Sequence, residues 1–202
     1  PYSHTNTASW SPGQGRVNVV AVDPSNPNTY YVGAPAGGIW KSVDAGITWN
    51  NTGNLTNNPD SMNDIYIDTA NPKILMVATS QGVFKSTDAG DNWTKTLNAN
   101  IIDLKMKPGN NSTWYATSGS TMYRSVDGGN TFSPSTTSGL KNSRRIAIAV
   151  TPANPNLVYF VSYNGSSEKN GFNGVYKSTS SGASWSKTAE SDDIFKGSQS
   201  WY

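Results

Sequence analysis

The sequence predicts an all-β fold, a β-propeller made of four-stranded antiparallel blades, and three observations support this prediction. A nine-residue motif occurs four times, as "KSVDAGITW" at 41–49, "KSTDAGDNW" at 85–93, "RSVDGGNTF" at 124–132 and "KSTSSGASW" at 177–185. Short apolar runs, separated by turns rich in Pro, Asn and Gly, precede each copy. Only 14% of the 202 residues are charged and 11% are aromatic, a composition that suits many short strands. A four-strand unit repeated about every 40–50 residues is typical of a propeller.

Each unit contains the same succession of four expected strands. The first strand lies in an alternating or apolar run, namely "VNVVAVDP", "DIYIDTANP", "IIDLKMKPG" and "RIAIAVTPANP". After a turn comes a second run, "TYYVGAP", "KILMVATS", "TWYATSG" or "LVYFVSY". The third strand begins at "GIWKS", "GVFKS", "TMYRS" or "GVYKS", and the motif leads into the fourth strand at its Trp or Phe. We therefore expect blades at approximately 16–55, 62–99, 100–138 and 144–190, with a leader segment at 1–15 and the start of a further blade at 191–202.

The repeated motif is interpreted as a fold-building turn between the third and fourth strands. Its Asp can accept hydrogen bonds from backbone N–H groups, its Gly permits a positive φ, and its aromatic ring packs beneath the hairpin. A catalytic acid is needed in one place, whereas this Asp recurs at equivalent places. In the fourth copy Ser180 replaces the Asp, and a turn tolerates such a weaker acceptor. The motif residues are Ser42, Asp44, Gly46 and Trp49; Ser86, Asp88, Gly90 and Trp93; Ser125, Asp127, Gly129 and Phe132; and Ser178, Gly182 and Trp185.

These four segments resemble the Asp-box repeats, also called BNR repeats, of sialidases, xyloglucanase-type glycoside hydrolases, sortilin-type propellers and photosystem assembly factors. The resemblance implies rings of six or more blades, so we expect the four blades to be part of a larger ring. The stretch "GRVNVVAVDPSNPNTYYVGAPAGGIWKS" is similar to propellers of large exported bacterial proteins, often those sent out by the type IX secretion system. This similarity implies a secreted or cell-surface location and the bacterial export machinery as a partner. Sialidase activity is not expected, because the Arg-Ile-Pro signature is absent and the chain has only four Arg.

Composition excludes several other function classes. The net charge is +2 and the basic residues are scattered, so there is no electrostatic footprint for nucleic acid. The chain has no Cys, and its single His lies at position 4, which excludes thiolate metal sites, Cys nucleophiles and His-based triads. No stretch approaches the ~18 apolar residues of a membrane-spanning helix. We expect no cofactor, no metal, no nucleic-acid partner and no direct membrane insertion.

Sites in propellers are expected where the inner strands converge on the central axis. Aligning the four inner strands places polar residues near their starts, at Arg16, Ser61, Asn100 and Arg144. Arg16 and Arg144 are candidates for clamping an anionic ligand. Alternating positions further along are expected to form the core between blades: Val20 and Val22; Ile65 and Ile67; Ile102, Leu104 and Met106; Ile146, Ile148 and Val150.

Asp64 and Asp103 hold equivalent places on the second and third inner strands. Two such carboxylates are candidates for the acid and base of glycoside hydrolysis, and the alternative is that both are structural.

Trp10, Trp114 and Tyr163 either stack on sugar rings or belong to blade cores. The loop at 163–174 is the longest insertion, and the triplets Asp60-Ser61-Met62 and Asp68-Thr69-Ala70 resemble short O-glycosylation sites of exported bacterial proteins.

The leading interpretation is a non-enzymatic propeller module of a secreted or cell-surface bacterial protein, presenting loops to a glycan or protein ligand. The alternative is a xyloglucanase-like glycoside hydrolase with part of its active site outside this stretch. A third hypothesis is a passive spacer whose partner is the export machinery.

Overall fold

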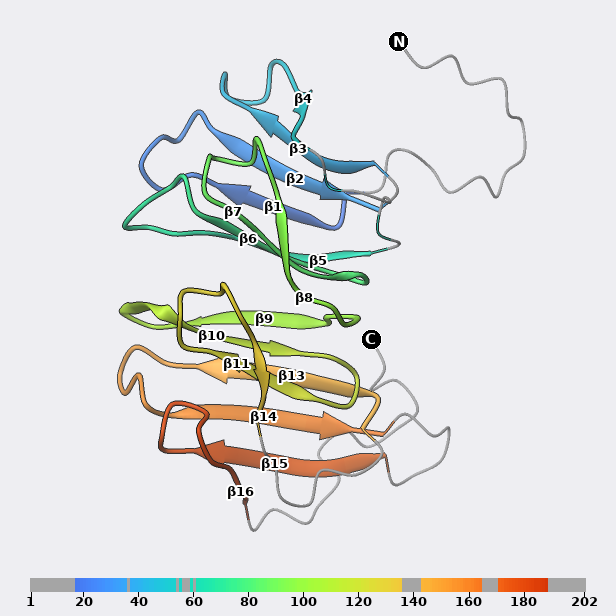
Figure 1. Ribbon diagram of the computed structural model, residues 1–202, viewed down its shortest axis with the longest axis vertical. Helices are drawn as coiled ribbons and strands as arrows, with labels where there is room; N and C mark the ends of the chain where they lie inside the picture. The colour runs from blue at the N-terminus through green and yellow to red at the C-terminus, as the bar shows by residue number, and fades with distance from the viewer. Residues whose placement is uncertain are drawn as a thin grey trace, which may run out of the picture.

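The computed structural model describes residues 17–35, 37–53, 55, 59, 61–135, 143–164 and 171–188, and in this part of the chain every regular element is a β-strand (Figure 1). The strands form four antiparallel sheets of four strands each, which confirms the predicted fold class. Each sheet uses its strands in chain order, with the first strand of each unit at one edge and the last at the other. We call the sheets blades 1 to 4.

The strands have the following bounds. Blade 1 contains β1 (Val19–Val22), β2 (Tyr30–Ala34), β3 (Gly38–Ser42) and β4 (Asn50–Asn51). Blade 2 contains β5 (Met62–Ile67), β6 (Leu75–Thr79), β7 (Gly82–Ser86) and β8 (Thr94–Leu97). Blade 3 contains β9 (Asp103–Lys107), β10 (Asn110–Thr117), β11 (Met122–Ser125) and β12 (Ser133–Pro134). Blade 4 contains β13 (Arg145–Val150), β14 (Val158–Tyr163), β15 (Phe172–Ser178) and β16 (Ser186–Lys187).

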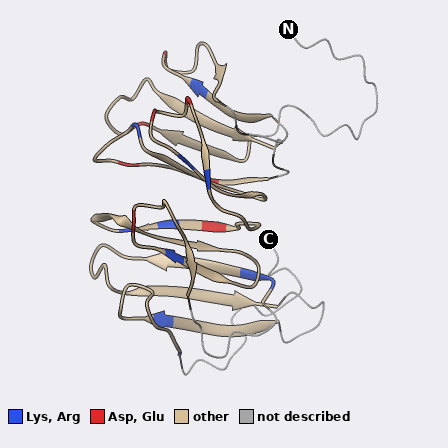
Figure 2. Cartoon of the chain, viewed as in Figure 1, with Lys and Arg blue, Asp and Glu red and all other residues tan. Residues whose placement is uncertain are grey.

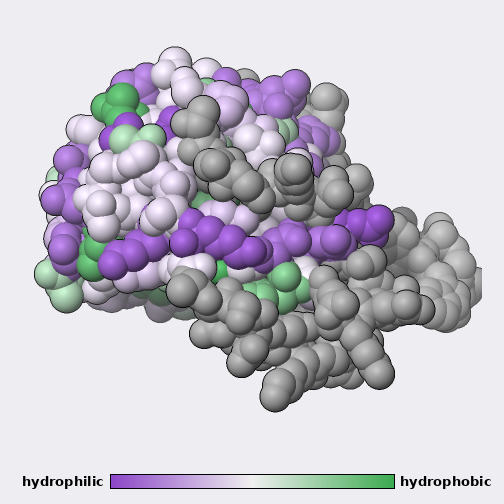
Figure 3. All heavy atoms as spheres, turned by 90° about the horizontal axis from the view of Figure 1, so that it is seen from below, coloured by the Kyte–Doolittle hydropathy of each residue, from purple (hydrophilic) through white to green (hydrophobic). Residues whose placement is uncertain are grey.

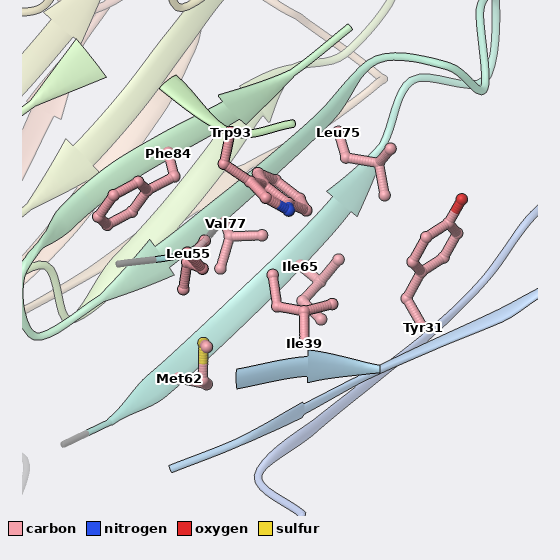
Figure 4. Close-up of a cluster of buried hydrophobic side chains, with 9 residues drawn as sticks. All are labelled: Tyr31, Ile39, Leu55, Met62, Ile65, Leu75, Val77, Phe84 and Trp93. Atoms are coloured by element: carbon pink, nitrogen blue, oxygen red, sulfur yellow. The ribbon is translucent and has the colours of Figure 1, made fainter. Parts of the chain in front are cut away.

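The blades stack face to face in chain order, so that the inner strands β1, β5, β9 and β13 are neighbours in that order (Figure 1). An apolar layer fills each seam. Between blades 1 and 2 it comprises Tyr31, Ile39, Leu55, Met62, Ile65, Leu75, Val77, Phe84 and Trp93 (Figure 4). The side chains of β6 alternate between the two seams, since Val77 faces blade 1 while Met76 and Ala78 belong to the cluster shared with blade 3. All five residues of β6 are therefore buried, as expected for a strand covered on both faces.

The prediction that Val20 and Val22 form core between blades is wrong. They are 60% and 50% exposed, whereas Val19 and Ala21, on the opposite face of β1, pack against the cluster shared with blade 2. The equivalent positions in blades 2 to 4 face the preceding blade, and Ile65, Leu104 and Ile148 are buried there. No described sheet lies against this face of blade 1, so its valines remain exposed.

The surface is polar, with few charges. Figure 2 shows Lys, Arg, Asp and Glu scattered singly over the four sheets, without a basic patch among the residues described. Viewed from the end formed by blade 4, the described atoms are mostly hydrophilic or neutral, with only small separate apolar areas (Figure 3). The seams between blades, rather than the outer faces, therefore hold most of the apolar surface.

Candidate functional site

A cleft of about 590 Å³ lies where the inner strands begin, and three successive blades contribute to it. Its lining residues are Ser61 and Asn63 from blade 2, Asn100 and Ile102 from blade 3, and Arg144, Arg145 and Tyr163 from blade 4. The structure thus brings together three of the four polar strand-start residues predicted from the alignment, Ser61, Asn100 and Arg144. The fourth, Arg16, lies outside the described residues. The cleft is polar, because amide, hydroxyl and guanidinium groups converge on it.

The backbone at Arg144 is fixed, although its side chain is exposed. Its N–H donates to the Tyr163 carbonyl at 2.8 Å, and the Ser143 hydroxyl donates to the Arg145 carbonyl at 3.1 Å. Gly119 allows the loop after β10 to pack against the same segment, because a Cβ there would lie 2.7 Å from the Arg144 carbonyl oxygen. The guanidinium is therefore carried on a rigid base at the cleft edge.

Asn63 joins blades 2 and 3 at the cleft. Its side-chain amide donates to the carbonyl of Ile101 at 2.6 Å, and Ile101 is fully buried between the two blades. This bond fixes the relative position of the polar groups that β5 and β9 bring to the cleft.

The aromatic candidates lie in different environments. Tyr163 lines the cleft but is only 8% exposed, because Gly171 passes directly over its ring. Little of its ring is therefore left exposed for stacking on a sugar. Trp114 is 2% exposed and donates its indole N–H to the Asn111 carbonyl at 2.8 Å, so it belongs to a blade core. Trp10 lies outside the described residues, as do 165–170 of the long loop.

Asp64 and Asp103 do not line this cleft. Both accept hydrogen bonds from the Lys105 ammonium, at 3.1 Å and 2.7 Å, and the second Asp103 oxygen accepts the N–H of Ile148 at 2.7 Å. We call Asp64, Lys105 and Asp103 the charged row. Through these bonds it connects the inner strands of blades 2, 3 and 4, and its side chains are 16–28% exposed.

The pKa shifts in this row follow from burial and pairing. Burial raises the pKa of Asp64, with the attraction of Lys105 opposing the shift. Burial acts to lower the pKa of Lys105, but its hydrogen bond to Asp103 and the attraction of both carboxylates raise it above the ordinary value. A general acid or base must exchange its proton with a substrate group within hydrogen-bond reach. Here the ammonium of Lys105 occupies that position on each carboxylate.

The repeated motif forms the same hydrogen-bonded turn in each blade. In the first copy the Ser42 hydroxyl accepts the N–H of Gly46 at 2.8 Å and donates to Asp44 at 2.7 Å, and Asp44 accepts the N–H of Thr48 at 2.9 Å. Hydrogen bonds from the side chain and backbone of Thr48 hold the pKa of Asp44 at about 2. Equivalent bonds lower the pKa of Asp88 and Asp127 to about 2. In the fourth copy the Ser180 hydroxyl accepts the N–H of Ser184 at 3.1 Å.

The backbone of the motif has a feature that the sequence analysis missed. The four motif glycines have φ of 87°, 92°, 77° and 76°, and the residue before each is also left-handed, at Ala45, Ala89, Gly128 and Ser181. That preceding N–H donates to a carbonyl in the turn between the first two strands or, in blade 3, at the start of the second strand; an example is the bond from Ala45 to the Asn28 carbonyl at 2.9 Å. The motif therefore holds its blade together as well as its own hairpin.

In blades 1 and 2 a basic residue directly before the motif Ser links the blade to the next one. The Lys41 ammonium donates to the Ala89 carbonyl at 3.0 Å, and the Lys85 ammonium donates to the equivalent Gly128 carbonyl at 2.8 Å. Between blades 3 and 4, Lys107 supplies the bond instead, donating to the Ser181 hydroxyl at 2.8 Å. The signal in the sequence was the Lys or Arg that precedes the Ser in all four copies.

Two further observations concern the residues that the structure describes. They contain no group of three or more His, Cys, Asp or Glu side chains arranged to hold a metal ion. They also contain no helix with the length and hydropathy needed to cross a membrane.

Comparison with known proteins identifies relatives among β-propellers. The profile of the Sortilin-Vps10 family, described as sortilin, neurotensin receptor 3, matches residues 81–199, more than half of the chain. A xyloglucanase of Hypocrea jecorina (strain QM6a) is 46% identical over 46 residues, which are 22% of this chain and 6% of that protein. These matches confirm the predicted resemblance to sortilin-type and xyloglucanase-type Asp-box propellers.

Solved structures of GH74 enzymes share the fold. An ancestral GH74 enzyme superposes with a TM-score of 0.73 and 27% identity, over 91% of this chain and 25% of that enzyme. The GH74 enzyme of Niastella koreensis gives a TM-score of 0.67 and 24% identity, over 83% of this chain and 28% of that enzyme. The chain thus spans about a quarter of the length of these enzymes.

Proposed function

The chain belongs to the Sortilin-Vps10 family, and from this premise we propose that it is a non-enzymatic glycan-binding propeller module of a secreted or cell-surface bacterial protein. The observation that carries the proposal is the cleft at the inner-strand starts, on which polar side chains of three blades converge. The two candidate carboxylates contribute no lining to it and are both engaged by Lys105.

The chemistry of the cleft suits a hydroxyl-rich ligand. Ser61, Asn63 and Asn100 offer donors and acceptors, while Ile102 is the single aliphatic residue among the described lining residues. A peptide ligand is usually anchored by apolar or aromatic side chains in apolar pockets, whereas most of the described lining residues are polar or charged. The similarity to a xyloglucanase adds support for a polysaccharide ligand.

Affinity electrophoresis in gels containing soluble polysaccharides tests the proposal. We expect at least one polysaccharide to retard the protein, and we expect Asn100→Ala to weaken the retardation because it removes an exposed amide from the cleft. Asn50→Ala is the matched control, since Asn50 is an exposed asparagine in β4 of blade 1. Absence of retardation by any polysaccharide, or equal effects of the two substitutions, would refute the assignment of this cleft.

A glycoside hydrolase is the second candidate, favoured by the similarity to the xyloglucanase and the GH74 enzymes. Release of reducing sugar from xyloglucan by the protein, and by its Asp64→Asn and Asp103→Asn variants, separates the two functions. The binding function predicts no release by the parent protein. Release that either substitution abolishes, with thermal unfolding unchanged, would establish the hydrolase instead.

We also propose export by the type IX secretion system, with the export machinery as a transient partner. Support comes from the similarity of the first blade to propellers of exported bacterial proteins. Detection of the protein in culture medium or on the cell surface, and its retention inside cells when the type IX channel is disabled, tests this. The intact mass of the exported protein also tests O-glycosylation at Ser61 and Thr69, since a mass equal to that of the bare polypeptide excludes it.

A further inference from the structure

The lining of the cleft includes an exposed basic side chain, that of Arg144. Among the described lining residues the charged ones are Arg144 and Arg145, and no Asp or Glu is among them. The carboxylates on the adjacent inner strands, Asp64 and Asp103, face Lys105 at 3.1 Å and 2.7 Å. Those two contacts are the ion pairs found within the described residues, and Arg144 takes part in neither. Figure 2 shows blue at the start of β13, one of several separate basic positions on the four sheets.

Arg144 combines an exposed side chain with a fixed backbone. The bond from its N–H to the Tyr163 carbonyl, at 2.8 Å, and the close packing of Gly119 hold the segment in place. The planar guanidinium can grip a planar carboxylate with two parallel hydrogen bonds, and the fixed backbone determines where on the cleft edge this contact forms. The carboxamides and hydroxyl on the neighbouring strands then face the remainder of the same ligand.

We infer that the cleft selects an acidic saccharide, one in which Arg144 holds the carboxylate of a hexuronic acid while Ser61 and Asn100 bind ring hydroxyls. This inference rests on the proposed glycan-binding function and adds the chemical class of the ligand. Asn63 fixes the spacing of these groups through its bond to the Ile101 carbonyl at 2.6 Å. An acidic peptide would bring apolar and backbone atoms into the cleft as well as carboxylates. The hydroxyl and amide groups of the described lining match the hydroxyls of a saccharide better.

Isothermal titration calorimetry with a matched pair of ligands tests the inference. The pair is an oligogalacturonide and its methyl ester, which differ in charge but share every ring hydroxyl. We expect the acid to bind about tenfold more tightly at low salt, the size typical of one charge-assisted contact. We expect Arg144→Gln to abolish this preference and added NaCl to reduce it. Lys73→Gln is the control, because Lys73 is exposed in the β5–β6 turn, at the end of blade 2 opposite to the cleft.

Each result leads to a definite conclusion. Equal binding of acid and ester, or a preference that survives Arg144→Gln, overturns the inference and leaves glycan binding intact. Failure of both ligands and of neutral xyloglucan oligosaccharides to bind refutes the proposed function itself. An acidic peptide such as oligoglutamate that binds as tightly, and depends on Arg144, would identify a protein ligand and overturn the saccharide assignment. Unchanged thermal unfolding of Arg144→Gln shows that any loss arises in the cleft.

Discussion

Replacing Lys105 with methionine removes the cation from the row that joins blades 2, 3 and 4. The change leaves the carboxylates of Asp64 and Asp103 without the ammonium that donates a hydrogen bond to each of them. Exposed ion pairs contribute about 0.2–1 kcal/mol, whereas breaking a buried pair costs about 3–5 kcal/mol. The side chains of this row are 16–28% exposed, between the two limits. We therefore expect the free energy of unfolding to fall by about 2–3 kcal/mol at pH 7.

The loss is expected to depend on pH, with a sign fixed by Asp64. Burial raises its pKa in the folded protein, so the folded state binds a proton more readily than the unfolded state. Stability then falls as pH rises through the interval between the unfolded and folded pKa values. Without Lys105 the opposing attraction is lost, so the pKa of Asp64 rises further and the interval extends upward. Lys105 itself is charged at both pH 4 and pH 7, because its pKa is raised.

Urea unfolding at pH 4 and pH 7 measures this difference. We expect the destabilisation by Lys105→Met to be smaller at pH 4 than at pH 7, because the raised pKa of Asp64 favours its neutral form at the lower pH. Adding Asp64→Asn to the variant is expected to restore part of the stability at pH 7. Lys73→Met, which removes an exposed lysine, serves as the control. An equal loss at the two pH values would show that packing of the lysine stem, rather than charge, accounts for the effect.

Three further predictions concern the turns of the blades. Ser86→Ala removes the hydroxyl that accepts the buried N–H of Gly90 at 2.9 Å, so the free energy of unfolding, followed by heating, should fall by about 1–3 kcal/mol. Thr87→Ala, at the exposed neighbouring position, is the control and should have little effect. Ser180→Asp supplies the carboxylate of the other three motifs to the Ser184 N–H and should raise Tm; an unchanged or lower Tm would contradict the equivalence of the four turns. Gly82→Ala should cost about 3 kcal/mol or more, because φ is 143° and the new Cβ would collide with the Leu97 carbonyl. Gly109→Ala, at φ 70° with open space around it, should cost only about 1–2 kcal/mol, and similar losses at the two glycines would refute the steric argument.

The fold could be predicted from the sequence because each blade repeats the same local pattern. The run "KILMVATS" contains β6, and "GVFKS" coincides with β7 at Gly82–Ser86. These patterns specify which residues form strands and in which order they pair. They do not specify which face of a sheet is covered by another sheet, and so the burial of Val20 and Val22 was predicted wrongly. Alternation along a strand marks its two faces without showing what covers each.

The site could be predicted only in part, for a similar reason. Aligning the inner strands identified Ser61, Asn100 and Arg144, because equivalent strand starts must meet around the propeller axis. Lys105 went unnoticed, although both candidate carboxylates accept hydrogen bonds from it. Its partners lie on its own strand and on the preceding blade, and the distances between their charged atoms depend on how the blades stack. Periodicity within one strand carries no information about that distance.

The contrast between repeated and unrepeated polar residues explains where binding is expected. The Ser and Asp of the motif direct their hydrogen bonds into their own turn, and Lys41 and Lys85 reach the carbonyls of the next blade. Residues that recur at equivalent places in this way are engaged in the fold, and substituting them should change stability before it changes binding. At the strand starts the same alignment position holds Ser61, Asn100 and Arg144, which differ chemically among blades 2, 3 and 4, while blade 1 has Arg16, an arginine as in blade 4. A requirement of the fold would select similar residues there, whereas recognition of one asymmetric ligand requires different ones.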